Sequence, residues 1–136
     1  MEATLTKNNV QVIQKVFADF QNGNIPAIVD ACSNEIIWGG YKNPHIPFSG
    51  LYYGKEGVME FFSRVADTIN ITAFEPREFI SDGDDVVAIG RHSGSVKSTG
   101  KTFDHDWCFR FHVKNGRILK FVSFADTYEV ATAFKE

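Results

Sequence analysis

Residues 102–113 read TFDHDWCFRFHV, and the alternation along this stretch decides the fold. Every second position holds an apolar side chain or a histidine, namely Phe103, His105, Trp107, Phe109, Phe111 and Val113. The positions between them hold Asp104, Asp106, Cys108, Arg110 and His112. Because successive side chains of a strand point to opposite faces, the stretch predicts a half-buried strand. His105 and Trp107 are therefore expected on the inner face of a sheet, among phenylalanines.

Three neighbouring stretches share the β-branched and aromatic composition of this strand. They are ITAFEPREFI at 71–80, DVVAIGRHSGSV at 85–96 and RILKFVSFADT at 117–127. The turn signals SDGD, KSTGK and KNG separate consecutive stretches, so the strands should follow one another as antiparallel neighbours. Gly90 and Gly94 lie inside the second stretch, where glycines can bend a sheet. The predicted sheet therefore curls and can enclose a cavity.

The N-terminal half shows helical periodicity instead. An apolar stripe over Ile13–Phe20 predicts a helix that begins near residues 6–9 and ends at the NGN of 22–24. Pro26 suits the first position of a short second helix. A further stripe predicts a third helix from Lys55 to Ile69.

Between the second and third helices, EIIWGG at 35–40 is typical of a short strand, and 41–54 of a long aromatic loop. Helices followed by a run of strands indicate the α+β class, with the helices packed on one face of the sheet. We therefore expect a cone-shaped, curved antiparallel (mixed) sheet wrapped by three N-terminal helices. The chain should form a single domain over 1–136.

Composition excludes several classes of function. The chain has 136 residues, a net charge of −3 and no basic stripe, so we expect no nucleic-acid partner. We also expect no membrane span and no export signal, which indicates a cytoplasmic location. No compact ligand spacing links the two cysteines or the four histidines, so neither a metal nor another cofactor is predicted. Thirteen phenylalanines can supply both a core and the wall of an aromatic cavity.

The end of the last predicted strand, FVSFADT at 121–127, leaves the orientation of Asp126 open. Both parities of this strand are apolar enough to face inward, and a bulge would switch the face. If Asp126 faces the cavity, its apolar surroundings raise the pKa of the carboxyl and make it a usable acid or base. If it faces outward, it caps Thr127 or a backbone turn.

Three short pieces carry a resemblance to a known family. They are the pattern G.Y.G..GV..FF at 50–62, the TGK hairpin at 99–101, and NGRI at 115–118 leading to ADT. In this order they resemble the SnoaL-like branch of the nuclear transport factor 2-like superfamily, over about Val10 to Thr127. The resemblance implies a cone-shaped α+β barrel, a homodimer formed through the sheet, and a pocket for a small hydrophobic molecule. Ketosteroid isomerase, polyketide cyclases, scytalone dehydratase and limonene epoxide hydrolase belong to this superfamily.

The known active sites of these relatives map incompletely onto the sequence. The last-strand aspartate of the cyclases corresponds to Ser123, and Asp126 stands three residues later. The base of ketosteroid isomerase falls near 38–40, where this chain has no carboxylate. At these two positions the chain therefore lacks the catalytic carboxylates known from the cyclases and ketosteroid isomerase.

The leading hypothesis is a cofactor-independent enzyme of the cyclase, isomerase or dehydratase kind, thus an isomerase or lyase, that moves a proton on a hydrophobic carbonyl compound. Asp126 and His105 are the acid–base candidates, although His105 could instead be a strand-end histidine with one hydrogen bond. The candidate substrate-binding residues are Phe17, Trp38, Tyr53, Phe61, Trp107 and Ser123. A non-catalytic binding or carrier module for an apolar ligand is the alternative. An interaction domain with a filled cone is a third possibility.

Overall fold

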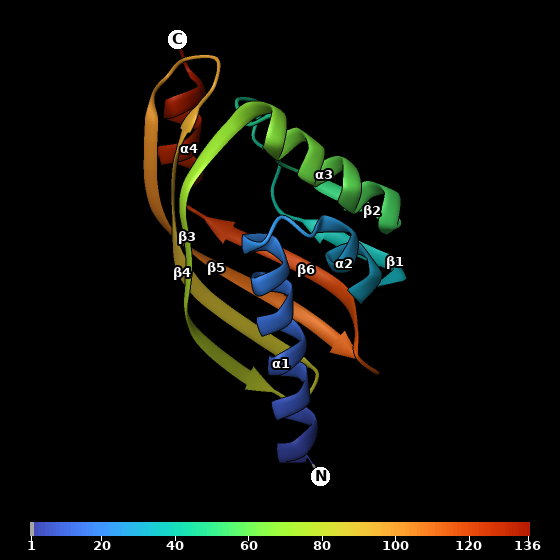
Figure 1. Cartoon of the computed structure of the whole chain (residues 1–136). Coiled ribbons are helices and arrows are strands. Elements are labelled where there is room, and N and C mark those ends of the chain that lie inside the picture. Colours follow the sequence, from blue (N-terminus) through green and yellow to red (C-terminus); the bar gives the residue numbers. More distant parts are fainter. Residues whose placement is uncertain (1) are drawn as a thin grey trace.

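The computed structural model describes residues 2–136, with side chains from residue 8 onward, and has a curved six-stranded sheet with four helices (Figure 1). In chain order the elements are α1 (Glu2–Gln21), α2 (Ile25–Ala31), β1 (Cys32–Gly39), β2 (Leu51–Tyr53), α3 (Gly54–Thr68), β3 (Ile69–Asp82), β4 (Asp85–Val96), β5 (Thr102–Lys114), β6 (Arg117–Ala125) and α4 (Thr127–Phe134). The strands lie in the order β2-β1-β6-β5-β4-β3. All neighbours are antiparallel except β1 and β6, so the sheet is mixed. The predicted α+β class is confirmed.

Two elements were missed by sequence reasoning. β2 lies within the stretch expected to be a loop, where Tyr52 pairs with Trp38 of β1. α4 follows Asp126 and is a C-terminal helix in addition to the three expected N-terminal helices, which are all present. Both elements are short, three and eight residues, so their periodicity is a weak signal. The equally short α2 was recognised with the help of Pro26, which suits the first position of a helix. The first helix also begins earlier than predicted, at Glu2.

Bulges opposite glycines bend the sheet. The register of β3 against β4 shifts between Ile71 and Ala73, opposite Gly94, and between Pro76 and Glu78, opposite Gly90. A Cβ atom at Gly90 would lie 2.2 Å from the Glu75 carbonyl oxygen and 2.4 Å from the Trp107 ring. Glycine therefore allows β3 and Trp107 to approach the backbone of β4 where the sheet bends. The predicted role of both glycines agrees with this geometry.

The predicted alternation of β5 is confirmed. Phe103, His105, Trp107 and Phe111 are buried, whereas Asp104, Asp106 and Arg110 are exposed. In β6 the register shifts so that Ile118 pairs with Val113 while Lys120 pairs with His112. Residues of both parities, Ile118 and Phe121, are consequently buried. This bulge is the reason that neither parity of the last strand could be assigned from the sequence.

The helices cover the concave face of the sheet (Figure 1). α1 packs on β3, β4 and β5, and α3 packs on β1, β2 and α2. The main core lies between these helices and the sheet. A second cluster gathers where α4 and the loop of 40–50 meet the hairpin end of β4 and β5, and it includes Ile46, Val96, Phe103, Val130 and Ala131. Within residues 2–136, no helix is both long and apolar enough to cross a bilayer.

Candidate functional site

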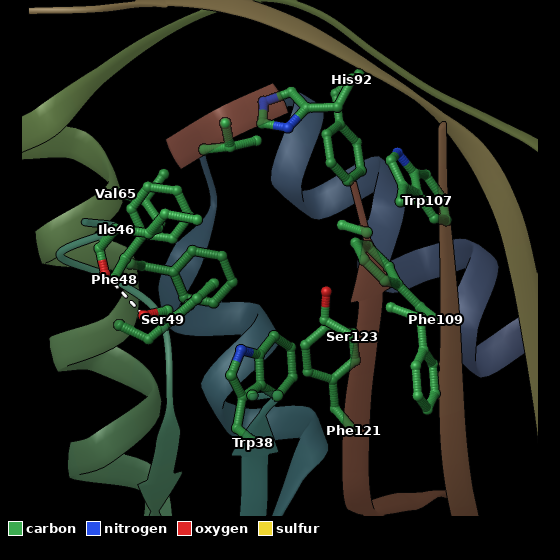
Figure 2. Close-up of a pocket in the computed structure, with 18 of the residues that line it drawn as sticks. Trp38, Ile46, Phe48, Ser49, Val65, His92, Trp107, Phe109, Phe121 and Ser123 are labelled. Atoms are coloured by element: carbon green, nitrogen blue, oxygen red, sulfur yellow. Dashed lines mark hydrogen bonds between the residues drawn. The ribbon is translucent and has the colours of Figure 1, made fainter. Parts of the chain in front are cut away.

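A cavity of about 310 Å³ lies between the concave face of the sheet and the helices (Figure 2). Its volume is at the lower end of the range for small-molecule sites. Every surrounding layer contributes to its wall, including Phe17 of α1, Trp38 of β1, Phe61 of α3, Trp107 of β5 and Ser123 of β6. The cone is thus hollow, which contradicts the filled interior expected for a pure interaction domain.

One wall of the cavity is a stack of nearly parallel aromatic rings. The centroids of Trp107 and Phe109 lie 4.1 Å apart with an interplanar angle of 14°. Phe74 stacks on Trp107 at 5.1 Å and 16°, and Phe17 at 5.5 Å and 18°. Interlocked aromatic rings have few alternative rotamers and present flat, polarisable faces. The wall therefore suits a flat, apolar ligand.

Two histidines lie side by side on the adjacent strands β4 and β5 and line the cavity, with their rings in an edge-to-face arrangement. His92 pairs in register with His105, and their ring centroids lie 5.3 Å apart. The Nδ1 atom of His105 lies 3.1 Å from the carbonyl oxygen of Asp106. Because a carbonyl only accepts hydrogen bonds, neutral His105 carries its proton on Nδ1 and a lone pair on Nε2. That Nε2 has no hydrogen-bond partner among the described residues, and the side chain is only 8% exposed.

The structure agrees in part with each of the two roles of His105 that the sequence left open. The residue makes one hydrogen bond, as a structural histidine would, yet it is buried and its second nitrogen is unpaired. It belongs to the lining of the cavity together with His92. A buried imidazole with one fixed and one free nitrogen is the arrangement that a general base requires.

Sequence reasoning missed His92. Burial, with a smaller contribution from His105, lowers the pKa of His92 to about 4, so the side chain is neutral at physiological pH. The turn KSTGK could have revealed it, because a hairpin closed there places residue 92 opposite residue 105. Two imidazoles on adjacent strands of one inner face are a stronger signal than either histidine alone.

The depressed pKa of His92 predicts a pH-dependent stability. Between its ordinary value of 6.5 and about 4, the unfolded chain binds a proton at this site and the native state does not. Stability should therefore fall as pH drops through this window, by about 3 kcal/mol at its acid end, and be unaffected above it. His92→Phe should remove this loss. Urea unfolding of both proteins at pH 7 and pH 4.5 measures it, and parallel pH profiles would contradict the assignment.

Three further side chains of the lining carry a hydrogen-bond donor, namely Trp38, Trp107 and Ser123. The indole N–H groups of Trp38 and Trp107 are buried without a partner among the described residues. The Ser123 hydroxyl points into the space between them (Figure 2). Among the described residues that line the cavity, none is Asp, Glu, Lys or Arg. The site thus offers imidazole, indole and hydroxyl groups but no fixed charge.

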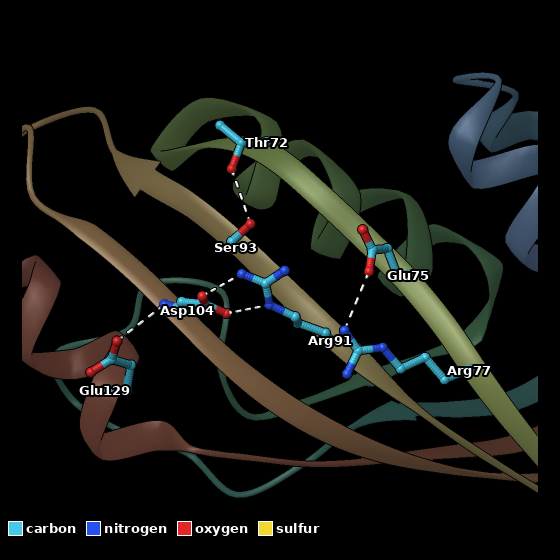
Figure 3. Close-up of polar contacts among 7 residues, drawn as sticks. All are labelled: Thr72, Glu75, Arg77, Arg91, Ser93, Asp104 and Glu129. Atoms are coloured by element: carbon cyan, nitrogen blue, oxygen red, sulfur yellow. Dashed lines mark hydrogen bonds and ion pairs between the residues drawn. The ribbon is translucent and has the colours of Figure 1, made fainter.

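Asp104 and Asp106 flank His105 in the sequence and lie on the opposite, outer face of β5. Figure 3 shows Asp104 with its partners there. Asp104 accepts hydrogen bonds from Nε, at 2.8 Å, and from Nη2 of Arg91, and this pairing lowers the pKa of its carboxyl. The backbone N–H of Asp104 donates to Glu129 of α4 at 3.1 Å. Asp106 is exposed on the same face. Neither carboxylate reaches the cavity, as the alternation in β5 indicates.

The structure does not place Asp126 in the cavity. Its side chain is exposed and accepts a hydrogen bond from the backbone N–H of Glu129 at 3.1 Å, which makes it the N-cap of α4. Of the two orientations that the sequence left open, the structure therefore favours the cap. Tyr53 also lies outside the cavity lining, 66% exposed beside an outer groove. The other predicted binding residues, Phe17, Trp38, Phe61, Trp107 and Ser123, line the cavity.

A substitution separates the two roles of Asp126. Asp126→Ala removes an N-cap and should lower the free energy of unfolding by about 1 kcal/mol, without changing ligand binding or turnover. Urea denaturation and a binding titration check this. Intact stability with lost activity would restore Asp126 as a candidate acid or base.

Other reactive groups do not form a second centre in the described part of the chain. No group of three His, Cys, Asp or Glu side chains within it could hold a metal ion. Burial raises the pKa of the Cys32 thiol to about 11, so it remains protonated and is a poor nucleophile at neutral pH. The cavity with its paired histidines is therefore the candidate site.

Comparison with known proteins agrees with this architecture. An NTF2-like protein from Burkholderia xenovorans LB400 is 27% identical and has a TM-score of 0.87, covering 96% of this chain and 98% of that one. An NTF2-like protein from Burkholderia thailandensis E264 is 25% identical with a TM-score of 0.86, covering 94% and 98%. TerC, co-crystallised with polyporic acid, is 22% identical with a TM-score of 0.82, covering 95% and 99%. No curated protein matches the sequence significantly.

The family assignment follows from sequence as well as shape. The SnoaL-like domain profile matches residues 13–121, which runs from the core face of α1 to the aromatic centre of β6. This span contains the helices that close the cone, the bulged strands that bend it, and both histidines of the cavity. The chain belongs to the SnoaL-like domain family of the NTF2-like superfamily.

Proposed function

We propose that the protein is a small enzyme of the cyclase, isomerase or dehydratase kind that moves a proton on a hydrophobic carbonyl compound without a cofactor. The observation that carries the proposal is the free Nε2 of His105, buried in an aromatic cavity while Nδ1 is held by the Asp106 carbonyl. Histidine is the side chain most often used for proton transfer near neutral pH. Membership of the SnoaL-like family supports the same class of chemistry.

In this mechanism the carbonyl compound lies flat against the stacked wall of Trp107 and Phe109. His105 Nε2 takes a proton from the carbon next to the carbonyl group, and the C–H electron pair moves into an enolate. Donors in the same cavity, the Ser123 hydroxyl and the indole N–H groups, can stabilise the enolate oxygen. The imidazolium then returns its proton to another carbon, to a departing hydroxyl group, or to the oxygen of a second carbonyl that the enolate has attacked. These outcomes correspond to isomerase, dehydratase and cyclase activity.

A neutral base has an advantage in this cavity. An ionised carboxylate would lose much of its hydration there, and no cation among the described lining residues would compensate it. A neutral imidazole becomes charged only when it takes the substrate proton, and the enolate formed in the same step is its counter-ion. The replacement of the family carboxylates by Ser123 and the paired histidines is consistent with this change of base.

Deuterium exchange tests the proposal. 2-Acetylnaphthalene is a flat methyl ketone whose protons next to the carbonyl are visible by NMR. In D₂O the protein should accelerate loss of the methyl signal in a saturable manner. Saturable binding of the ketone without any accelerated exchange would contradict catalysis.

A carrier or binding module is the second candidate function, and the absence of a carboxylate among the described lining residues favours it. A carrier should retain its ligand through purification, because release is then the slow step. Native mass spectrometry of freshly purified protein distinguishes the two: a bound small molecule supports a carrier, and an empty protein that exchanges the ketone supports an enzyme.

A further inference from the structure

The hydrogen-bonding groups at the histidine end of the cavity define what a ligand must offer there. His105 presents a lone pair on Nε2, since its N–H is already used by the Asp106 carbonyl. His92 is neutral and makes no hydrogen bond among the described residues, so it presents one N–H and one lone pair. Two acceptors and one donor therefore meet at this end. A ketone oxygen can satisfy only the donor.

Resting on the site of the proposed function, we infer that the physiological ligand is a flat aromatic acid whose O–H and neighbouring oxygen hydrogen-bond to ring nitrogens of the His92–His105 pair. A carboxylic acid, a phenol or an enolised dicarbonyl has both a donor and acceptors, so it can accept from the His92 N–H and also fill one of the two imidazole lone pairs that a ketone leaves unpaired. The Ser123 hydroxyl, which also lines the cavity, can bind a second oxygen on the same ligand. The nearly parallel rings of Phe17, Trp107 and Phe109 require the ligand to be flat.

Binding of such an acid must take up a proton. In solution near pH 7.5 a carboxylic acid is ionised and His92 is neutral. No cation among the described residues lines the cavity, so an unaccompanied anion would be desolvated without compensation. The complex avoids this only if one proton enters with the ligand. Whether that proton lies on the ligand oxygen or on an imidazole, the bound state contains one proton more than the separate molecules.

Neighbouring charges do not supply that proton. They belong to side chains that do not line the cavity: the exposed Glu75 of β3, Asp104 and Asp106 of β5 and Asp126, and the half-buried Arg91 of β4 and Glu129 of α4. The side chains that α1 and α3 contribute to the cavity lining are apolar and include Phe20 and Val65. The loop of 40–50 contributes Tyr41, which is 81% exposed at the opening. The proton taken up on binding is therefore shared between the ligand and the two histidines.

Two isosteric probes test the inference. 2-Naphthoic acid and 2-acetylnaphthalene share a flat ring system and differ in one O–H for one methyl group. Between pH 7 and 8.5, the affinity for the acid should fall about tenfold per pH unit, and the affinity for the ketone should stay constant. Calorimetry of the acid in phosphate and in Tris at pH 7.5 should show uptake of about one proton.

Substitutions show which residue is responsible for the preference for the acid. His92→Phe keeps an aromatic ring beside Phe74 and Phe103 and should weaken binding of the acid by about 10- to 100-fold, while the ketone changes by less than about threefold. His112→Phe is the matched control, since His112 pairs with Asp85 outside the cavity, and should change neither affinity. Tyr41→Phe should leave the pH dependence of the acid unchanged.

Each outcome separates this inference from the proposed function. Tighter, pH-independent binding of the ketone overturns the inference, and catalysed exchange of that ketone would still support the enzyme. Binding of the acid with proton uptake, but no exchange of the ketone, supports the inference and refutes that catalysis. If neither probe binds, the cavity is not a site for flat aromatic oxygen compounds and both proposals fail.

Discussion

His105→Gln is expected to slow the exchange of the methyl protons of 2-acetylnaphthalene in D₂O by about 10²–10⁴-fold. Removing a general base typically has an effect of this size. Glutamine keeps a polar side chain of similar reach and can still donate to the Asp106 carbonyl, which His105 Nδ1 contacts at 3.1 Å. It has no basic nitrogen, so the substrate proton has no acceptor at this position. The rate at saturating ketone, followed by NMR, measures the loss.

The matched control for this prediction is His112→Gln. His112 lies on the outer face of β5, where its Nδ1 is 3.1 Å from Asp85, and its replacement should leave exchange unchanged. Unaltered circular dichroism and unfolding midpoint in His105→Gln would exclude loss of the fold as the cause. If His105→Gln retains the wild-type exchange rate, another group is the base.

Gly90→Ala is expected to lower the free energy of unfolding by more than about 3 kcal/mol. The added Cβ would lie 2.2 Å from the Glu75 carbonyl oxygen and 2.4 Å from the Trp107 ring. Neither neighbour can move freely: the first is backbone of the bulged β3, and the second is held in the aromatic stack. The free energy needed to move the β3 backbone and a core side chain away from this Cβ atom exceeds the usual cost of overpacking. Urea unfolding followed by tryptophan fluorescence gives the value.

Gly100→Ala provides the comparison for a glycine with no close neighbour. A Cβ atom added there would have no heavy atom within 4 Å, and only the positive φ of 74° opposes the substitution. We expect a loss of about 1 kcal/mol there. If both substitutions lower the free energy of unfolding equally, the close approach of β3 and Trp107 to Gly90 does not explain why glycine is needed where the sheet bends.

Much of the fold could be predicted because its signals are local. The alternation of residues 102–113 identified the inner face of β5, and turn residues separated the strands. The missed parts depend on distant partners. β2 is a strand only because β1 lies beside it, and α4 is held by burial of Val130 and Ala131 against β4 and β5. Neither contact can be inferred from the residues of the short segment itself.

A residue of the site could be predicted from the sequence where the alternation of its strand determines which face its side chain occupies. Trp107 and His105 line the cavity as expected, whereas Asp126 follows the bulged strand and caps α4. His92 required the register between β4 and β5, which is a property of the pair. The homodimer and the cytoplasmic location stay predictions from the resemblance and the composition.

The most direct test of the cavity and its two imidazoles is a long-range ¹H–¹⁵N NMR titration of the histidine rings with 2-acetylnaphthalene. The ring signals of His92 and His105 should shift saturably, and free His105 should show the tautomer protonated on Nδ1, as its 3.1 Å contact with the Asp106 carbonyl requires. His45 and His112, which do not line the cavity, should not respond. Saturable binding with no shift at His92 or His105, or an Nε2-protonated His105, would contradict the account.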